Sequence, residues 1–325
     1  MTSASQAVEP PAYPLELQWI DLAAYRRGNT GIDHVHSFDS GVAGPHVMVN
    51  ALTHGNELCG MHAVRRLLDA GVRPRAGRLT LSFANVAAYE RFAPDNLRAR
   101  CIDRDFNRLW HDDLLAADRH SVEGRRAHAM LPVVHTVDRL LDLHSTWHAV
   151  LPFFVLSRLP RVRRLADTLA LPPRQLLLPG FRHEGYHLID YGGFADGDAG
   201  AIGLIAECGQ HFSARSADMA WQVALRFLQV TGSIDAVDAR RLGLAPKPLG
   251  PIDRYEIVQP VIATSDHLRL TGSYAGFDVF KAGAVAAFDG EVPVVAPFDD
   301  AIVLAPRPDP VAGQQAFAWG RRLAA

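Results

Sequence analysis

The chain has 325 residues, of which 48% are hydrophobic and 21% charged, values that are ordinary for a protein with a substantial buried core. Its 33 basic and 35 acidic side chains nearly cancel, leaving a formal net charge of −2. This balance excludes the strong basic field that draws proteins to nucleic acid or anionic membranes, so we expect neither as a partner.

The first residues, MTSASQAVEPPAYP, contain neither a basic leader nor an apolar core, and we expect residues 1–14 to form a loose arm rather than a signal peptide. No apolar run approaches the roughly 20 residues that a spanning helix needs. The three cysteines are an odd number without paired metal-site spacing. These features predict a protein of the reducing cytoplasm.

Apolar strand-like runs alternate with helical patterns from residue 46 onward, which predicts an α/β sheet. Strands are expected at 46–52, 78–86, 139–144, 153–157 and 200–207. Helices are expected from residue 58 to Gly71, from about 117 to 137, and along an apolar stripe from Ala217 to Leu228 that Gly232 closes.

The composition changes after about residue 240. Residues 242–255, LGLAPKPLGPIDRY, are rich in Pro and Gly, as a linker is. Short apolar runs follow, separated by Gly, Pro and Asp and without a helical period. We expect a catalytic domain at 15–240 and a small all-β domain at 241–325, with no lysine placed as in a lipoyl or biotinyl carrier.

Polar residues recur where the expected strands end. His54 and Glu57 follow the first strand in VNALTHGNELCG, His144 follows another in DLHST, and Glu207 ends a third in IAECGQH. Ligands of open α/β sheets bind beyond the carboxyl ends of the strands. We therefore expect these side chains to converge on one crevice.

Two histidines and a carboxylate are a ligand set for catalytic zinc, which keeps a fourth position for water and lowers the pKa of that water from about 15.7 to about 7. A lone turn histidine is more often a surface residue, but the pairing of His54 with Glu57 and His144 favours one zinc ion per chain. Gly55 would permit the tight backbone path between the first two ligands. The helical pattern H-E-x-x-H is absent, and H-x-x-E-H would need a histidine in place of Leu58.

The segment RARCIDRDFNRLW holds a fourth polar cluster. Solvated charged loops are common, but Asn107 and Arg108 side by side can grip a carboxylate, Arg108 through its planar fork. Arg100 could polarise a carbonyl at its developing oxyanion. Asp105 and Asp142 are candidates for carboxylates that orient a metal ligand.

Glu207 is not needed as a ligand. It could serve as general base and acid, taking a proton from zinc-bound water and passing it to the leaving amine. A surface ion pair is the alternative, which the buried run IGLIA before Glu207 disfavours. Catalysis by a cysteine would need an activating base that the sequence does not indicate.

The motifs HGNE, DRDFNR, DLHST and ECGQ resemble, in order and separation, those of the succinylglutamate desuccinylase and aspartoacylase family across residues 45–230. The resemblance implies an α/β, mixed-sheet, zinc carboxypeptidase-like three-layer domain followed by a small all-β C-terminal domain. It implies zinc held by His54, Glu57 and His144, with Glu207 as the catalytic carboxylate. It also implies that Arg100 polarises the scissile carbonyl and that Asn107 and Arg108 bind the substrate carboxylate.

The chain departs from the family pattern at Phe106, where the family's DLNR motif has leucine, and ECGQ differs from the aspartoacylase version of that motif. The residues that choose the acyl group cannot be aligned from the motifs. Tyr186, Tyr191 and His211 are candidates for that role.

These features predict a zinc-dependent amidohydrolase, a deacylase that cleaves the amide of a small N-acyl amino acid or a related carboxylate-bearing compound. The alternatives are a metallocarboxypeptidase on the same scaffold and a non-catalytic binding protein that carries a metal. The sequence leaves open the acyl group, the amine half, the pathway and whether the chain forms a homo-oligomer.

Overall fold

The structure is a computed structural model that describes residues 13–179, 185–246, 250–307 and 309–324. Its strands are β1 (Val35–Asp39), β2 (His46–Ala51), β3 (Arg78–Phe83), β4 (Arg139–Thr146), β5 (Phe153–Leu156), β6 (Arg174–Leu177), β7 (Ile202–Gln210), β8 (Asp253–Ile262), β9 (Leu268–Leu270), β10 (Val279–Phe280), β11 (Val285–Asp289), β12 (Val292–Val295), β13 (Ala301–Leu304) and β14 (Gln315–Arg322). Its α-helices are α1 (Leu58–Asp69), α2 (Val86–Tyr89), α3 (Asp112–Ala117), α4 (Val122–Val134), α5 (Pro160–Leu169), α6 (Ala214–Val230) and α7 (Ala236–Arg241). Short 3₁₀ helices are η1 (Ala23–Tyr25), η2 (Phe106–Arg108), η3 (Leu188–Asp190) and η4 (Gly192–Phe194).

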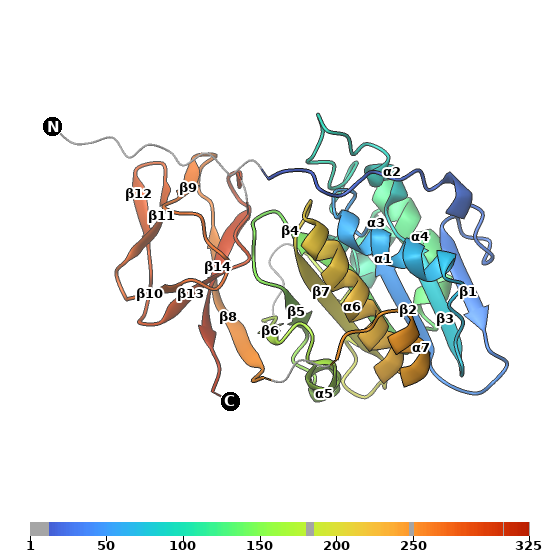
Figure 1. Cartoon of the computed structure of the whole chain (residues 1–325). Helices are drawn as coiled ribbons and strands as arrows, with labels where there is room; N and C mark the ends of the chain where they lie inside the picture. The colour runs from blue at the N-terminus through green and yellow to red at the C-terminus, as the bar shows by residue number, and fades with distance from the viewer. Residues whose placement is uncertain (1–12, 180–184, 247–249, 308, 325) are drawn as a thin grey trace.

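The strands form one mixed sheet of eleven strands, in the order β1-β3-β2-β4-β7-β5-β6-β8-β14-β13-β10, and a separate antiparallel sheet, β12-β11-β9 (Figure 1). At the centre β3, β2, β4 and β7 run parallel to one another. Their carboxyl ends therefore meet at one edge of the sheet. The expected class, a mixed-sheet α/β domain with a small β region at the C-terminus, is confirmed.

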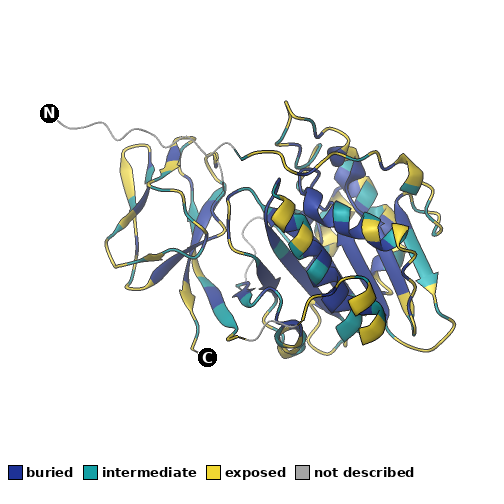
Figure 2. Cartoon of the chain, viewed as in Figure 1, coloured by how far each residue is buried: buried dark blue, intermediate teal, exposed yellow. Residues whose placement is uncertain are grey.

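The centre of the sheet is buried on both faces, as Figure 2 shows for β2, β4 and β7. Successive side chains of a strand point to opposite faces, so Val47 and Val49 pack in the core under α1 and α6, and Met48 packs in the core under α4. The apolar stripe of α1, spaced by three and four residues, faces the same side as α6. Helices on both faces of the sheet make the three layers.

Most of the expected elements are present, with shifted ends. The helix expected from about 117 to 137 is the shorter helix α4, which begins after Ser121, because the side chain of Ser121 accepts a hydrogen bond from Gly124 there. The strand expected at 78–86 ends at Phe83, where the chain turns toward α2. The strands β1, β6, β9, β11 and β14 have no counterpart among the expected ones.

The chain after α7 does not separate from the main sheet. β8 begins at Asp253, inside the expected linker, and its first four residues pair in parallel with β6. From Tyr255 onward β8 also pairs with β14 on its other side, so the C-terminal strands continue the catalytic sheet beyond β6. The boundary at 240/241 matches the end of α7, and the division into two domains stays a prediction.

The expected N-terminal arm lies outside the described residues except for Tyr13 and Pro14. The hydroxyl of Tyr13 accepts a hydrogen bond from the backbone N–H of Ala149. In the described part of the chain, no helix is long and apolar enough to cross a membrane.

Candidate metal centre

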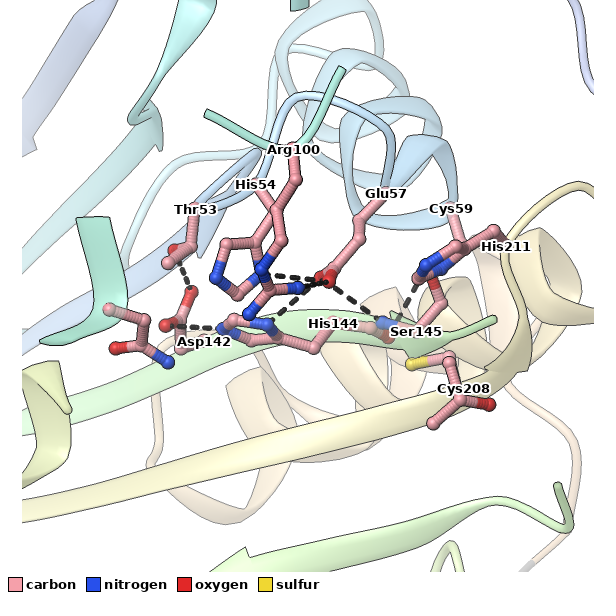
Figure 3. A network of polar contacts seen from close by, with 12 residues as sticks. Thr53, His54, Glu57, Cys59, Arg100, Asp142, His144, Ser145, Cys208 and His211 are labelled. Atoms are coloured by element: carbon pink, nitrogen blue, oxygen red, sulfur yellow. Dashed lines mark hydrogen bonds and ion pairs between the residues drawn. The ribbon is translucent and has the colours of Figure 1, made fainter. Parts of the chain in front are cut away.

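Three buried side chains meet at the carboxyl edge of the sheet. The ring atom Nδ1 of His54 lies 2.7 Å from Oε1 of Glu57, and Nδ1 of His144 lies 2.9 Å from Oε2 of the same carboxylate (Figure 3). Each of the three offers a ligand atom within 4.8 Å of the others, and each residue is 2% exposed. The structure thus brings together the three residues that the sequence predicts as zinc ligands.

The ends of two parallel strands position these ligands. His54 lies three residues after the end of β2, and Glu57 directly precedes the first residue of α1. His144 lies in the carboxyl half of β4, which pairs with β2. Gly55 is required because a Cβ atom there would lie 2.5 Å from the Ala99 carbonyl oxygen and from the Tyr89 nitrogen. Close packing, rather than a left-handed backbone, accounts for this glycine.

Carboxylates hold the far side of each histidine ring. Asp105 lies 3.0 Å from Nε2 of His54, and Asp142 lies 2.7 Å from Nε2 of His144. The other oxygen of Asp142 accepts hydrogen bonds from Asn50 and Thr53. An imidazole that donates Nε2–H to a carboxylate presents the lone pair of Nδ1 to a cation. Two such rings and a carboxylate are a donor set that fits Zn²⁺.

The charges of the centre stabilise one another in the absence of a cation. Burial alone would raise the pKa of Glu57, but His54 and His144 lower this pKa well below its ordinary value. Burial would likewise lower the pKa of His144, but Asp142 and Glu57 raise it well above 6.5. A cation would take the place of protons that these groups share, so its binding releases protons.

Arg100 borders the centre. Its Nε and Nη2 donate to Oδ2 of Asp105 at 3.1 and 2.9 Å, and its Nη1 lies 3.4 Å from Oε1 of Glu57. Burial would raise the pKa of Asp105, but Arg100, His54 and Arg108 lower it well below its usual range. The guanidinium therefore lies beside the ligands, as the sequence predicts for a group that polarises a carbonyl.

Asn107 and Arg108 belong to η2, which follows Asp105. The backbone N–H of Asn107 donates to Asp105, and the side-chain oxygen of Asn107 accepts a hydrogen bond from the N–H of Leu188 at 2.9 Å. Because the side-chain oxygen of Asn107 is held by this hydrogen bond, the orientation of its amide NH₂ group is fixed in this buried residue. Nη1 of Arg108 donates to the carbonyl of Asn107. Both residues follow Asp105 closely along the chain, and Asp105 itself contacts the metal ligand His54.

Glu207 lies on β7, in register with His144 on β4. Its Oε2 atom is buried and has no hydrogen-bond partner among the described residues. Burial, partly offset by His144, raises the pKa of Glu207 to about 8. A carboxyl with a pKa near neutrality exchanges a proton readily at physiological pH, which suits a general base and acid.

The three candidates for acyl selection lie in different places. His211 is buried, and its Nδ1 lies 2.8 Å from Oγ of Ser145, whose backbone N–H donates to Glu57 (Figure 3). Tyr186 stacks on His111, donates its backbone N–H to the carbonyl of Arg108 and accepts a hydrogen bond from the N–H of Trp110. Tyr191 lies 3.1 Å from His135, which follows α4 and precedes β4, so it is remote from the carboxyl edge of the sheet.

The sequence patterns did not identify Asn50, Thr53 and Ser145 as part of the site. Asn50 is fully buried directly after the apolar run 47–49 of β2, and a buried amide needs hydrogen-bond partners. That polar residue inside an apolar run was the available signal. Ser145 gives no comparable signal, because its role depends on its backbone N–H and on the distant His211.

The family model of the succinylglutamate desuccinylase/aspartoacylase catalytic domain matches residues 43–228, more than half of the chain. A search of the curated proteins finds no match.

Three solved structures illustrate the shared fold. Succinylglutamate desuccinylase from Vibrio parahaemolyticus is 17% identical, with a TM-score of 0.64 over 90% of this chain and 87% of that chain. An aspartoacylase family protein from Mesorhizobium loti is 20% identical, with a TM-score of 0.60 over 90% of each chain. The product-bound ectoine utilization protein EutE from Ruegeria pomeroyi is 16% identical, with a TM-score of 0.62 over 88% of each chain.

At these identities the structures show the fold, and the family model adds the sequence relationship over the segment that carries the site. The resemblance of the four motifs is thereby confirmed. The chain belongs to the succinylglutamate desuccinylase/aspartoacylase family.

Proposed function

We propose that the protein is a zinc-dependent deacylase that hydrolyses the amide bond of a small N-acyl amino acid or a related carboxylate-bearing compound. The observation that carries the proposal is the buried His54–Glu57–His144 cluster beside Glu207 on the adjacent strand, whose buried Oε2 atom has no hydrogen-bond partner in the described part of the chain. A merely structural metal site would not need a half-buried acid with a pKa of about 8 beside it.

Zinc held by His54, Glu57 and His144 would supply a Lewis acid that lowers the pKa of water and polarises the scissile carbonyl. Glu207 accepts a proton from the attacking water as the new C–O bond forms. It then donates that proton to the nitrogen as the C–N bond breaks, giving a free acid and a free amine. The same residue therefore acts first as base and then as acid.

The remaining polar residues bind and orient the substrate. Arg100, beside Glu57, donates hydrogen bonds to the carbonyl oxygen as negative charge develops on it. Arg108 and the amide NH₂ of Asn107 hold the carboxylate of the substrate. The cytoplasmic location expected from the sequence stays a prediction.

The proposal is tested with purified, zinc-loaded protein and a panel of N-acetyl and N-succinyl amino acids, with C-terminally free peptides as the comparison. We expect release of acetate or succinate with the matching amine, and no cleavage of the peptides. Glu207→Gln should keep zinc and lose turnover. Cleavage of peptides alone would identify a carboxypeptidase, and full activity of Glu207→Gln would overturn the assigned role of Glu207.

A further inference from the structure

A tight turn at residues 102–104 connects Arg100 to Asp105. The backbone N–H groups of Ile102, Asp103 and Arg104 all donate to the carboxylate of Glu123, at 2.6, 3.0 and 3.1 Å. Three successive N–H groups that converge in this way form a nest, a concavity that binds an anion. In this chain the anion is a side chain that comes from the first turn of α4.

Glu123 is fully buried, so water does not compete for its oxygens. Its Oε1 also accepts a hydrogen bond of 3.0 Å from the side chain of Asn85, which lies just after β3. Hydrogen bonds to an ionised acceptor are roughly twice as strong as neutral ones. The carboxylate therefore fixes the turn to two rigid parts of the scaffold, α4 and the end of β3.

The turn holds α4 in return. The carboxylate of Asp103 accepts a hydrogen bond of 2.7 Å from the N–H of Val122, the first residue of that helix. Asp103 is exposed, so this contact is weaker than the buried one made by Glu123. The two acids thus clamp the turn and the helix together from both sides.

Both ends of the turn lead into the metal centre. The carbonyl of Arg100 accepts a hydrogen bond from Gly55, and Asp105 contacts both Arg100 and His54. We propose that Glu123 is a positioning residue of the zinc site: it holds the 102–104 turn so that Asp105 orients His54 and Arg100 faces the substrate carbonyl. The Arg100 part of this inference rests on the proposed function, and the His54 part does not.

The variant Glu123→Gln tests the inference, because it keeps the shape of the side chain and directs an NH₂ group at backbone N–H groups. We expect the affinity for zinc, measured by competition with a chelator and without substrate, to fall about 10- to 100-fold, as it does for other groups that orient metal ligands. With zinc saturating, kcat should fall while KM changes little, because the side-chain amide of Asn107 is held by the N–H of Leu188, which lies outside the turn.

Asp289→Asn is the matched control. Asp289 is also a buried carboxylate that accepts a backbone N–H and hydroxyl groups, but it lies in the C-terminal three-stranded sheet. Both variants should lower the unfolding temperature, whereas the affinity for zinc should fall only in Glu123→Gln. Equal zinc affinities in the two variants would overturn the inference.

A double variant separates positioning from a general loss of stability. If Glu123 acts on kcat through Arg100, then adding Glu123→Gln to Arg100→Ala should lower kcat little further. If the fold-losses in kcat of the two single variants multiply in the double variant, Glu123 does not act through Arg100. Should Glu123→Gln fail to fold, Asp103→Ala releases the clamp from its exposed side and should weaken zinc binding in the same direction, to a smaller extent. An unchanged affinity in that variant would refute the clamp.

If the wild type cleaves no N-acyl amino acid, the proposed function fails but the zinc measurements still decide the role of Glu123 toward His54.

Discussion

His144 and Glu207 are register partners on the adjacent parallel strands β4 and β7. Side chains in register on neighbouring strands project from the same face of the sheet. Glu207 is also paired on its other side, with Phe153 of β5. Because a slip of one residue would turn either side chain to the opposite face, the sheet itself fixes the proposed acid and base beside the ligand.

The raised pKa of Glu207 makes the stability of the metal-free protein depend on pH. The folded pKa of about 8 exceeds the ordinary value of 4.5, so folding favours the protonated form. The contribution of protonated Glu207 to the free energy of unfolding is fully present below about pH 4.5 and is lost as the pH rises through 8. We therefore expect metal-free Glu207→Gln to gain stability over the metal-free wild type between pH 5 and pH 9. Urea unfolding at the two pH values measures this gain, and a difference independent of pH would contradict the assignment.

Asp142 orients His144, and its replacement should weaken the metal site. In Asp142→Asn an amide replaces a carboxylate that accepts hydrogen bonds from Asn50 and Thr53 and contacts His144. We expect zinc to bind about 10- to 100-fold more weakly, measured by chelator competition. Asp235→Asn, which alters the surface cap of α7, is the control and should keep the wild-type affinity. If Asp142→Asn binds zinc as tightly as the wild type, Asp142 does not orient His144 for metal binding.

Arg108 should contribute to substrate binding more than to the chemical step. Loss of hydrogen bonds between a guanidinium and a carboxylate removes about 1.5–3 kcal/mol, so Arg108→Ala should raise KM about 10- to 100-fold. Zinc content should stay the same. Arg241→Ala changes a surface arginine on α7 and should leave KM unaltered. If Arg108→Ala lowers kcat alone, the substrate carboxylate is bound elsewhere.

Gly55 lies between two ligands and tolerates no side chain. In Gly55→Ala the new methyl group would overlap the backbone at Ala99 and Tyr89, and overpacking of this kind costs about 1–3 kcal/mol. Thermal unfolding should show the loss, together with weaker zinc binding. Gly200→Ala, where no atom lies within 4 Å of the added Cβ, should behave as the wild type. A stable, zinc-replete Gly55→Ala would show that the backbone relaxes there.

The metal ligands could be predicted from sequence because His54 and Glu57 follow one apolar strand and His144 lies near the end of another, and the parallel order of these strands brings their ends together. The contacts that hold these ligands from outside could not be predicted in this way. Glu123 is an acid in the first turn of a helix, where acids are common, and only the fold shows that three N–H groups from 19 to 21 residues earlier converge on it. The start of strand β8 could not be predicted for a similar reason. Its pairing with β6 joins segments almost 80 residues apart, and its first residues lie in a stretch typical of linkers.

In the proposed enzyme His54, Glu57 and His144 share one divalent cation. Elemental analysis of active, extensively dialysed protein tests it most directly, with His144→Ala as the ligand variant and His62→Ala, on the adjacent helix α1, as the control. We expect one zinc ion per chain in the wild type and in His62→Ala, and none in His144→Ala. Zinc-free wild type with full activity, or His144→Ala that retains its zinc, would contradict the claim.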